Sequence, residues 1–216
     1  PGVGLVPPGG FIPVAERSDL IVEIDRWVLL EATRQMAEWS DDPEMGDLPV
    51  SVNISGRHLS GGSLVNDVVS ALQTHGVAGE QLIVEVTETA LMDDLAAAAR
   101  ELGRLRERGV RVALDDFGTG YMSLATLRNL PVDVLKIDRS FIAQMESARD
   151  HTLVELIVNT GHLLGVSVTA EGVETPQQAD LLTRLGSDHQ QGFLFSRPLD
   201  APTLLRRLDA ATAPTG

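Results

Sequence analysis

The sequence predicts an α/β fold in which a parallel sheet closes as a TIM-like (β/α)8 barrel. Short apolar segments alternate with longer amphipathic ones, about 20 to 35 residues per unit. The short segments have one aliphatic face and one small or polar face, and the polar face ends in a functional group. A barrel places such a face inside and helices outside, whereas a doubly wound sheet is covered by helices on both faces. We therefore expect the barrel.

Six segments are expected to form strands, because they are short and rich in Val, Leu and Ile, as buried parallel strands are. Within Val110–Asp115, valine and leucine occupy one face, while Arg111, Ala113 and Asp115 occupy the other. The other segments repeat this division between an aliphatic and a polar face. The expected strands are Pro49–Ile54, Gln81–Val86, Val110–Asp115, Val132–Ile137, Val166–Glu171 and His189–Phe195.

Amphipathic segments around and between the strands are expected to be helices. One of them carries leucine and alanine at helical spacing and is followed by Gly109, which suits the left-handed position after a helix. Arginines at its end, among them Arg106, are expected to complement the helix dipole on a solvated face. The helices are expected at about Asp19–Trp39, Ser63–His75, Asp93–Arg108, Asp150–Leu164, Pro176–Leu185 and Ala201–Ala211.

Composition excludes several classes of site and partner. The 216 residues include no cysteine, so disulfides, thiolate nucleophiles and cysteine zinc sites are excluded. The five histidines show no metal-binding spacing, and a net charge of −14 argues against a nucleic-acid polymer as partner. No window approaches the roughly 18 apolar residues of a membrane span, and no signal peptide is visible. We expect a cytoplasmic domain without membrane contact, within a parent protein that could itself be membrane-anchored.

The last inward-facing residue of each expected strand is polar. In a barrel the carboxyl ends of parallel strands meet at one mouth, so these side chains should converge. Asp116 can turn inward where its strand gives way to a loop, and Glu88 and Glu174 lie three residues beyond two members of the set. The set is Asn53, Glu85, Asp115, Lys136, Glu171 and, near the start of the final strand, Gln191.

This set of residues favours a metal site. A single carboxylate after a strand is most often a helix N-cap, but several carboxylates on one face would repel one another without cations. Oxygen ligands without His or Cys favour Mg²⁺, Mn²⁺ or Ca²⁺ over zinc, and adjacent aspartates suit two ions about 3.5–4 Å apart. Lys136, the only lysine, can orient a nucleophilic water or neutralise developing charge. Its alternative role is a charge-balancing ion pair inside the barrel.

Seven motifs then extend along nearly the whole chain. They are FIPVAE (Phe11–Glu16), VNIS (Val52–Ser55), EVTE (Glu85–Glu88), DDFGTGY (Asp115–Tyr121), LPVDVLKID (Leu130–Asp138), AEGVET (Ala170–Thr175) and QGFLFSRPL (Gln191–Leu199). In this order and spacing they resemble the EAL-domain family, the cyclic di-GMP phosphodiesterases of bacteria. One motif alone would be weak, whereas the seven together are highly specific.

The resemblance implies metal-dependent hydrolysis of cyclic di-GMP to linear pGpG in bacterial second-messenger signalling. It implies two Mg²⁺ or Mn²⁺ ions, with Ca²⁺ inhibitory. Lys136 resembles the residue that positions the attacking water, and Glu171 is expected to serve both catalysis and metal binding. Glu174 and Gln191 resemble substrate-side residues, and Glu88 resembles the glutamate that steadies the DDFGTGY loop. The implied metal ligands are Asn53, Glu85, Asp115, Asp116 and Glu171.

The same resemblance implies partners and domain context. Cyclic di-GMP is the implied ligand, and the DDFGTGY loop with the following helix is similar to the family's dimerisation element, so a homodimer is expected. A sensory or diguanylate-cyclase-type domain is a possible upstream partner in the parent protein. Met122 replaces the first of two serines that the family usually has after the loop, and we expect it to alter the loop's hydrogen bonding and the dimer contact.

A second departure concerns the motif E-A-L-x-R, which in the family lies shortly upstream of Phe11–Glu16 and supplies a metal-binding Glu and a substrate-binding Arg. It is absent here, and six strands are counted where eight close a barrel. Residues 1–216 are therefore expected to form a single EAL-type domain that lacks its N-terminal portion, with poor or no catalysis by itself. The alternative is a catalytically inactive EAL-like module that binds cyclic di-GMP or serves as a protein-interaction scaffold.

Overall fold

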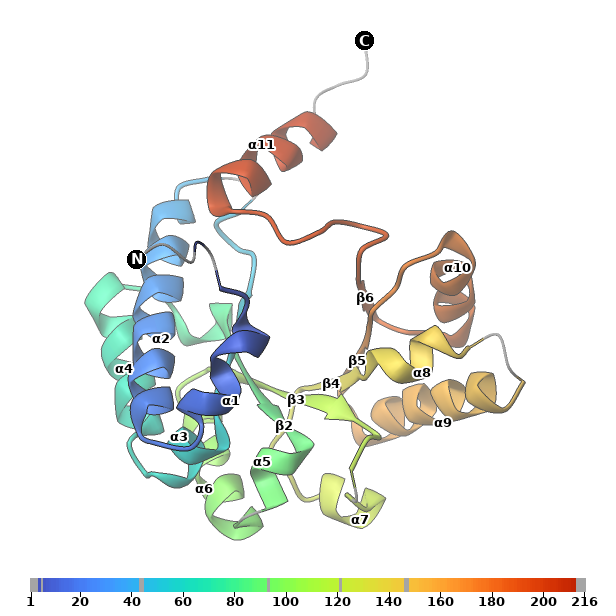
Figure 1. Ribbon diagram of the computed structural model, residues 1–216, viewed down its shortest axis with the longest axis horizontal. Helices are drawn as coiled ribbons and strands as arrows, with labels where there is room; N and C mark the ends of the chain where they lie inside the picture. The colour runs from blue at the N-terminus through green and yellow to red at the C-terminus, as the bar shows by residue number, and fades with distance from the viewer. Residues whose placement is uncertain are drawn as a thin grey trace.

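The computed structural model describes residues 4, 6–42, 45–92, 94–120, 122–145 and 148–212. Its six strands form one parallel sheet in sequential order, β1-β2-β3-β4-β5-β6. The sheet curls and helices lie along its outer side (Figure 1), which is the TIM-like architecture that the sequence predicts. Because all the strands run parallel, their carboxyl ends lie at the same end of the sheet. The strands are β1 (Val50–Asn53), β2 (Leu82–Thr87), β3 (Arg111–Phe117), β4 (Val134–Ile137), β5 (Ser167–Glu171) and β6 (His189–Gln191).

The aliphatic face of the sheet forms the main core. Val84, Val112, Leu135 and Val168, one from each of four neighbouring strands, are all 0% exposed. Leucines and valines of the flanking helices pack against them in one continuous cluster. Because this face is filled by apolar side chains, the other face is left to the polar residues that alternate with them.

Helices connect the strands, and their ends follow from local sequence. The long helices match the expected segments, and Thr175 with Gln178 forms a complete capping box at the start of one of them. Among the described helices, none is long and apolar enough to cross a membrane. The long helices are α2 (Leu20–Trp39), α4 (Leu64–His75), α6 (Leu95–Arg106), α9 (Ala148–Leu164), α10 (Pro176–Leu185) and α11 (Ala201–Thr212).

Short helices, most of them located after a strand, are the main addition to the expected fold. Four or five residues are too few to show a helical period, so the sequence pattern does not reveal them. Several follow a strand almost directly and so help to shape the rim of the sheet. The short helices are α1 (Ile12–Ala15), α3 (Gly56–Ser60), α5 (Glu88–Met92), α7 (Leu124–Leu127) and α8 (Arg139–Ala143), with 3-10 turns at Pro8–Gly10 and Gly79–Gln81.

The final strand is shorter than expected. It ends at Gln191 rather than Phe195, because the chain turns across the backbone of Val173 at Gly192. A Cβ at Gly192 would lie 2.1 Å from the carbonyl oxygen of Val173, so only glycine allows this approach. An apolar segment after the crossing, including the exposed Phe193 and Phe195, therefore lies outside the sheet.

Candidate metal centre

A β-bulge places two carboxylates next to each other on β3. The register between β3 and β4 advances three residues on β3 but two on β4, so Asp115 and Asp116 together lie opposite Lys136. Asp116 has φ 54°, the only positive φ at a non-glycine residue in the described part of the chain. From the sequence we expected Asp116 to turn inward where the strand gives way to a loop. In the structure Asp116 turns inward within β3, which continues to Phe117.

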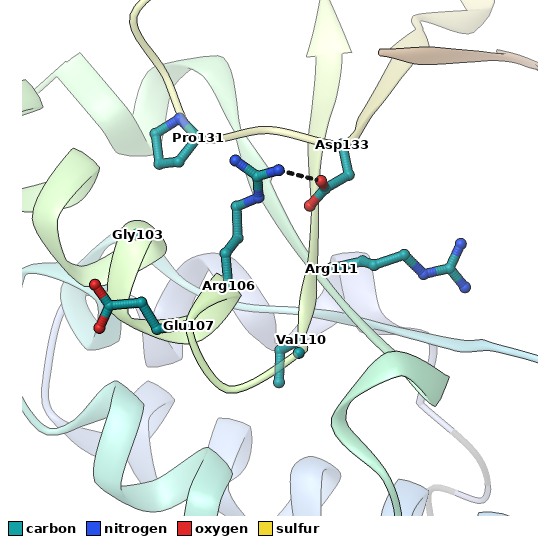
Figure 2. Close-up of a pocket in the computed structure, with 8 residues that line it drawn as sticks. Gly103, Arg106, Glu107, Val110, Arg111, Pro131 and Asp133 are labelled. Atoms are coloured by element: carbon teal, nitrogen blue, oxygen red, sulfur yellow. Dashed lines mark ion pairs between the residues drawn. The ribbon is translucent and has the colours of Figure 1, made fainter. Parts of the chain in front are cut away.

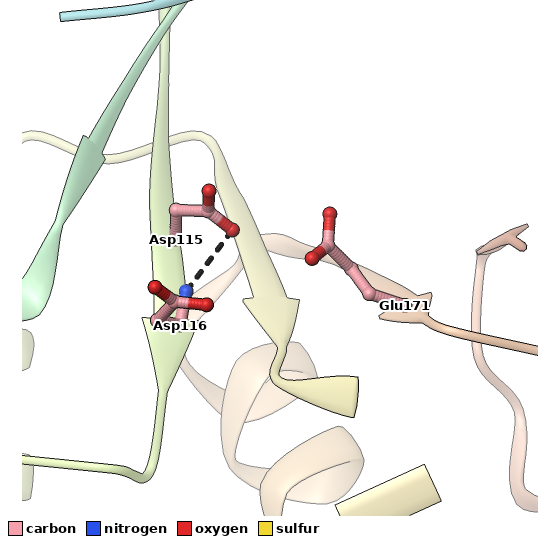
Figure 3. A group of neighbouring side chains, drawn as sticks. All are labelled: Asp115, Asp116 and Glu171. Atoms are coloured by element: carbon pink, nitrogen blue, oxygen red, sulfur yellow. Dashed lines mark hydrogen bonds between the residues drawn. The ribbon is translucent and has the colours of Figure 1, made fainter. Parts of the chain in front are cut away.

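Three carboxylates converge at the carboxyl ends of β3 and β5. Asp115, Asp116 and Glu171 each offer an oxygen, and these oxygens lie within 4.8 Å of one another (Figure 3). Burial raises the pKa of Asp116, and the charges of Asp115 and Asp138 raise it further. Burial also raises the pKa of Glu171, although a hydrogen bond from Lys136 opposes this. The cluster thus holds closely spaced negative charge that a cation would stabilise.

Lys136 is the cation that the chain itself supplies to this cluster. Its Nζ lies 2.6 Å from Glu85 Oε2, 2.6 Å from Glu171 Oε1 and 3.3 Å from Asp115 Oδ1. Burial alone would lower the pKa of Lys136, but the neighbouring carboxylates outweigh it and raise the pKa above its usual value. The side chain therefore stays protonated at neutral pH and acts as a donor, not as a base. The charge-balancing ion pair considered from the sequence is present.

Glu88, the first residue of α5, holds the loop that follows β3. Its buried carboxylate accepts hydrogen bonds from the backbone N–H groups of Gly118 (3.4 Å), Gly120 (3.2 Å) and Met122. A Cβ at Gly120 would meet that carboxylate at 2.6 Å, so a larger residue there would force the Glu88 side chain to shift. Met122 contributes its backbone N–H, so this hydrogen bond does not depend on the side chain at position 122. Tyr121 lies outside the described residues.

Asn53 ends β1 beside this cluster. It is the register partner of Glu85, and it is exposed along a groove of about 1100 Å³ lined by β1, α2 and the N-terminal segment. Within the described residues, the Asn53 side chain makes no hydrogen bond. Its position therefore depends on the backbone of β1 and on the turn that follows.

Two further residues expected at the site lie at its rim. Glu174 is exposed in the turn after β5, where its backbone N–H donates to Gln178 Oε1 at 2.8 Å. Gln191 is exposed at the end of β6 as the register partner of Glu171. The structure thus brings together Glu85, Asp115, Asp116, Lys136 and Glu171, and it leaves Asn53, Glu174 and Gln191 around them.

Sequence reasoning missed the contribution of Asp138. This residue caps α8 by accepting hydrogen bonds from Ser140, and its charge contributes to the raised pKa of Asp116. Burial opposes the lowering of its own pKa, but the hydrogen bonds from Ser140 outweigh burial. Strand alternation was the available signal, because Asp138 lies two residues after Lys136 and therefore on the same side of β4.

A second depression, of about 420 Å³, lies at the opposite, amino ends of β3 and β4 (Figure 2). Arg106 Nη2 lies 2.8 Å from Asp133 Oδ1, and the other oxygen of Asp133 accepts from the backbone N–H of Val112 at 2.9 Å. Arg106 was expected to complement the dipole of α6 on a solvated face. It does lie in the last turn of α6 with an exposed side chain, and its ion pair also ties the end of α6 to the residue before β4.

Comparisons with known proteins agree with this architecture. The model of the EAL domain family matches residues 1–198. The protein named bifunctional diguanylate cyclase/cyclic di-GMP phosphodiesterase MucR, from Pseudomonas aeruginosa, is 45% identical over 206 residues, which is 95% of this chain and 30% of that protein. The chain thus spans about a third of the length of this curated relative.

Solved structures agree as well. The structure titled PaMucR phosphodiesterase, c-di-GMP complex, superposes with a TM-score of 0.90 at 44% identity, covering 94% of this chain and 83% of that one. A calcium/cyclic di-GMP complex of BlrP1 from Klebsiella pneumoniae superposes with a TM-score of 0.79 at 29% identity, covering 90% of this chain and 48% of that one.

Proposed function

Because the chain belongs to the EAL domain family, we propose that it is the hydrolase domain of a cyclic di-GMP phosphodiesterase, which cleaves cyclic di-GMP to linear pGpG in bacterial signalling. The observation that carries this proposal is the cluster of Asp115, Asp116 and Glu171, whose oxygens lie within 4.8 Å of one another where the strands end. The relatives support the substrate, since MucR is named for this activity and its phosphodiesterase was solved with c-di-GMP.

The donor chemistry fits divalent cations. All candidate ligands supply oxygen, and the raised pKa values of Asp116 and Glu171 reflect a cost of burying negative charge that a cation would remove. We propose two Mg²⁺ or Mn²⁺ ions, with Ca²⁺ as an inhibitor; the calcium complex of BlrP1 supports a site for hard cations. Bound ions of this kind supply Lewis-acid polarisation of a phosphoryl oxygen. The proposed ligands are Asn53, Glu85, Asp115, Asp116 and Glu171.

The chain's own residues would orient the attacking water and hold the loop beside the site. Lys136 stays protonated, so its Nζ can donate a hydrogen bond to the attacking water and fix its direction. Glu171 Oε1 lies 2.6 Å from that Nζ, so its carboxylate would help to orient the same water. Glu88 keeps the loop after β3 beside the cluster, and Glu174 and Gln191, both exposed, would contact the substrate.

The proposal extends to assembly. Residues 1–216 would act as one EAL-type domain, in support of which the family model covers residues 1–198. The loop held by Glu88 and the following α7 would form a homodimer contact, and the exposed Leu124 at the start of α7 supplies an apolar group for it. The relative MucR combines this activity with a diguanylate cyclase in one protein, which supports a similar domain partner here.

A nucleotide assay tests the proposed activity. The natural protein that contains this chain is incubated with cyclic di-GMP and Mg²⁺ or Mn²⁺, and the products are separated by chromatography. We expect linear pGpG to form only with the metal present. Binding of cyclic di-GMP measured by calorimetry, without any pGpG, would contradict the enzyme and support a sensing module; an absence of both would leave a scaffold.

A further inference from the structure

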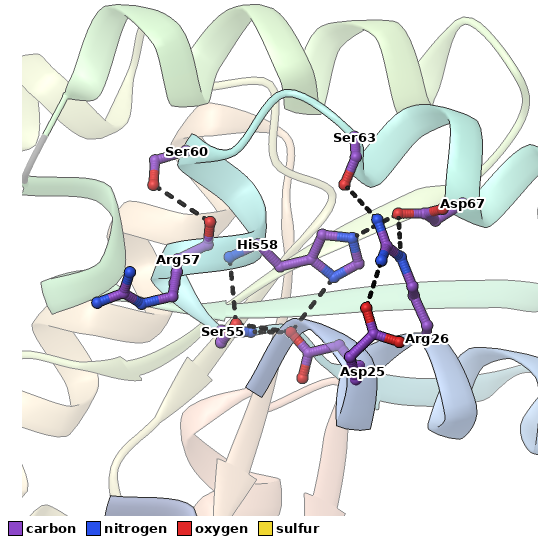
Figure 4. Close-up of polar contacts among 9 residues, drawn as sticks. Asp25, Arg26, Ser55, Arg57, His58, Ser60, Ser63 and Asp67 are labelled. Atoms are coloured by element: carbon purple, nitrogen blue, oxygen red, sulfur yellow. Dashed lines mark hydrogen bonds and ion pairs between the residues drawn. The ribbon is translucent and has the colours of Figure 1, made fainter. Parts of the chain in front are cut away.

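A buried polar network holds the turn that leaves β1 (Figure 4). Asp25 of α2 is only 5% exposed, and its Oδ2 accepts hydrogen bonds from both the backbone N–H (3.0 Å) and the hydroxyl (2.6 Å) of Ser55. The hydroxyl of Ser55 in turn accepts from the backbone N–H of His58 at 3.2 Å and so caps α3. One carboxylate on α2 therefore fixes the backbone two residues after Asn53.

The rest of the network keeps this carboxylate in place. His58 is 0% exposed, with Nδ1 at 3.3 Å from Asp25 Oδ2 and Nε2 at 3.0 Å from Asp67 Oδ2. Asp67, on α4, also receives Arg26 Nε at 2.9 Å. The network thus links α2, α3 and α4 through charged groups, although burying charge is costly and an apolar contact could join three helices as well. Its contact with the end of β1 is the feature that helix packing alone does not require.

We propose that Asp25 is a positioning residue for Asn53, an inference that rests on the proposed metal-dependent function. After Asn53, the backbone N–H of Ile54 donates to Glu85 at 2.9 Å, and Ser55 is held by Asp25. These two anchors, one on β2 and one on α2, hold the backbone directly after Asn53 and so set where its side chain starts. Partners behind a metal ligand usually set its geometry in this way.

The network also offers a matched control. Asp25 and Asp67 are both carboxylates that face His58, one on each side of the ring. Asp25 contacts the turn after β1, whereas Asp67 joins α2 to α4 through Arg26 and, among the described residues, makes no hydrogen bond to β1 or its turn. If the network only packs helices, Asp25→Asn and Asp67→Asn should both lower the melting temperature, and the two variants should affect Asn53 equally. If Asp25 positions Asn53, only Asp25→Asn should also move Asn53.

The direct test is the side-chain amide of Asn53 in a ¹H–¹⁵N spectrum, assigned by its loss in Asn53→Asp. We expect Asp25→Asn to shift or broaden this pair of signals, because a neutral amide oxygen accepts the two Ser55 bonds more weakly than the carboxylate does, while Asp67→Asn leaves the signals in place. Should Asp25→Asn fail to fold, Ser55→Ala replaces it, and Ser55→Thr, which keeps the hydroxyl, should restore the wild-type signals. Unchanged Asn53 signals in both Asp25→Asn and Ser55→Ala would overturn the proposal.

Metal binding gives a second readout that does not require turnover. Paramagnetic titration with Mn²⁺ should show an affinity about tenfold weaker for Asp25→Asn than for wild type, the usual cost of removing a partner behind a ligand. Asp67→Asn should match the wild type. Equal affinities of the two variants would contradict the proposal. If the wild-type protein binds no Mn²⁺, the proposed function fails, while the Asn53 signals still decide whether Asp25 positions this residue.

Discussion

Lys136 shows how a single residue stabilises the candidate site. Its buried ammonium group pairs with Glu85, Asp115 and Glu171, and without it these carboxylates would lie close together with no cation from the chain. Breaking a buried ion pair by removing one partner typically costs about 3–5 kcal/mol, because it leaves an uncompensated buried charge. The pairs are therefore significant for stability in the metal-free protein, whatever else Lys136 does.

We therefore expect Lys136→Met to lower the free energy of unfolding by about 3 kcal/mol in the absence of metal, measured by urea denaturation. Adding millimolar Mg²⁺ should recover part of this loss, because an ion bound only to the folded state stabilises it. The matched variant Arg34→Met removes pairs with Glu31 and Glu38 in which every side chain is exposed, and it should change little. A Lys136→Met protein as stable as wild type would show that the cluster does not depend on this charge.

His58 should make stability depend on pH. Burial alone would lower the pKa of His58, but Asp25 and Asp67 outweigh burial and raise it above the usual value. A raised folded-state pKa means that the stabilisation is complete below the unfolded value of about 6.5 and is lost as the pH rises through the folded value. We expect urea unfolding to show this loss above about pH 6.5 in wild type. His58→Gln should flatten the profile, and His151→Gln should not; a parallel wild-type and His58→Gln profile would refute the assignment.

At the residue scale, strand alternation predicted much of the candidate site. It placed Glu85, Asp115, Lys136 and Glu171 on one face, and these four are joined by ion pairs in the structure. It could not predict the bulge that brings in Asp116, because a bulge breaks the period of two on which the argument depends. Asp25 gave no signal, since a helix residue reaches a strand end only through the tertiary fold.

The bulge of β3 is an element that stores backbone strain at the site. Asp116 occupies the left-handed region, which costs an L-residue about 1–2 kcal/mol, although aspartate tolerates it better than most. Strain of this kind tends to be found at functional sites, where the surrounding structure holds the conformation.

Two substitutions separate this strain from the carboxylate. Asp116→Gly and Asp116→Ala both remove the charge, but only glycine adopts a positive φ without a penalty. We expect the glycine variant to be more stable than the alanine variant by about 1 kcal/mol in thermal or urea unfolding, and both to bind Mn²⁺ more weakly than wild type. Equal stability of the two variants would show that the left-handed conformation is not imposed by the bulge.

The hydrogen bonds that hold the loop after β3 can also be tested. Removing the Glu88 side chain would leave the backbone N–H groups of Gly118, Gly120 and Met122 without their acceptor. We expect Glu88→Ala to speed limited proteolysis within residues 118–122, because the loop would open locally more often. Met122→Ser keeps the backbone donor and serves as the control. Equal cleavage rates in wild type and Glu88→Ala would mean that the loop is held by other contacts.

At the element scale, the prediction succeeded where elements are long or end in clear signals. Gly109 follows its helix with the positive φ expected of it, and α10 occupies its expected range. The short helices after the strands could not be predicted, because each spans about one turn and depends on its cap and on tertiary packing. The length of β6 was wrong because the crossing at Gly192 is a long-range contact, invisible in a local pattern.

The architecture of the whole molecule explains where the candidate site lies. Parallel strands bring all their carboxyl ends to one end of the sheet, and helices with an apolar core cover one face. The polar side chains therefore gather on the other face, at that end. This arrangement followed from strand–helix alternation in the sequence. The groove beside Asn53 could not be foreseen, because it depends on how α2 and the N-terminal segment lie along β1. The central claim is that the carboxylates at this mouth bind the metals that hydrolysis needs.

Comparing wild type with Asp115→Asn in the natural protein tests this claim most directly. Asparagine keeps the shape of the side chain at the centre of the cluster but removes the charge that two ions would share. The account predicts Mg²⁺- or Mn²⁺-dependent pGpG formation by the wild type and a loss of at least about a thousandfold in Asp115→Asn, with both proteins folded to the same extent. Near-wild-type turnover by Asp115→Asn would contradict the account.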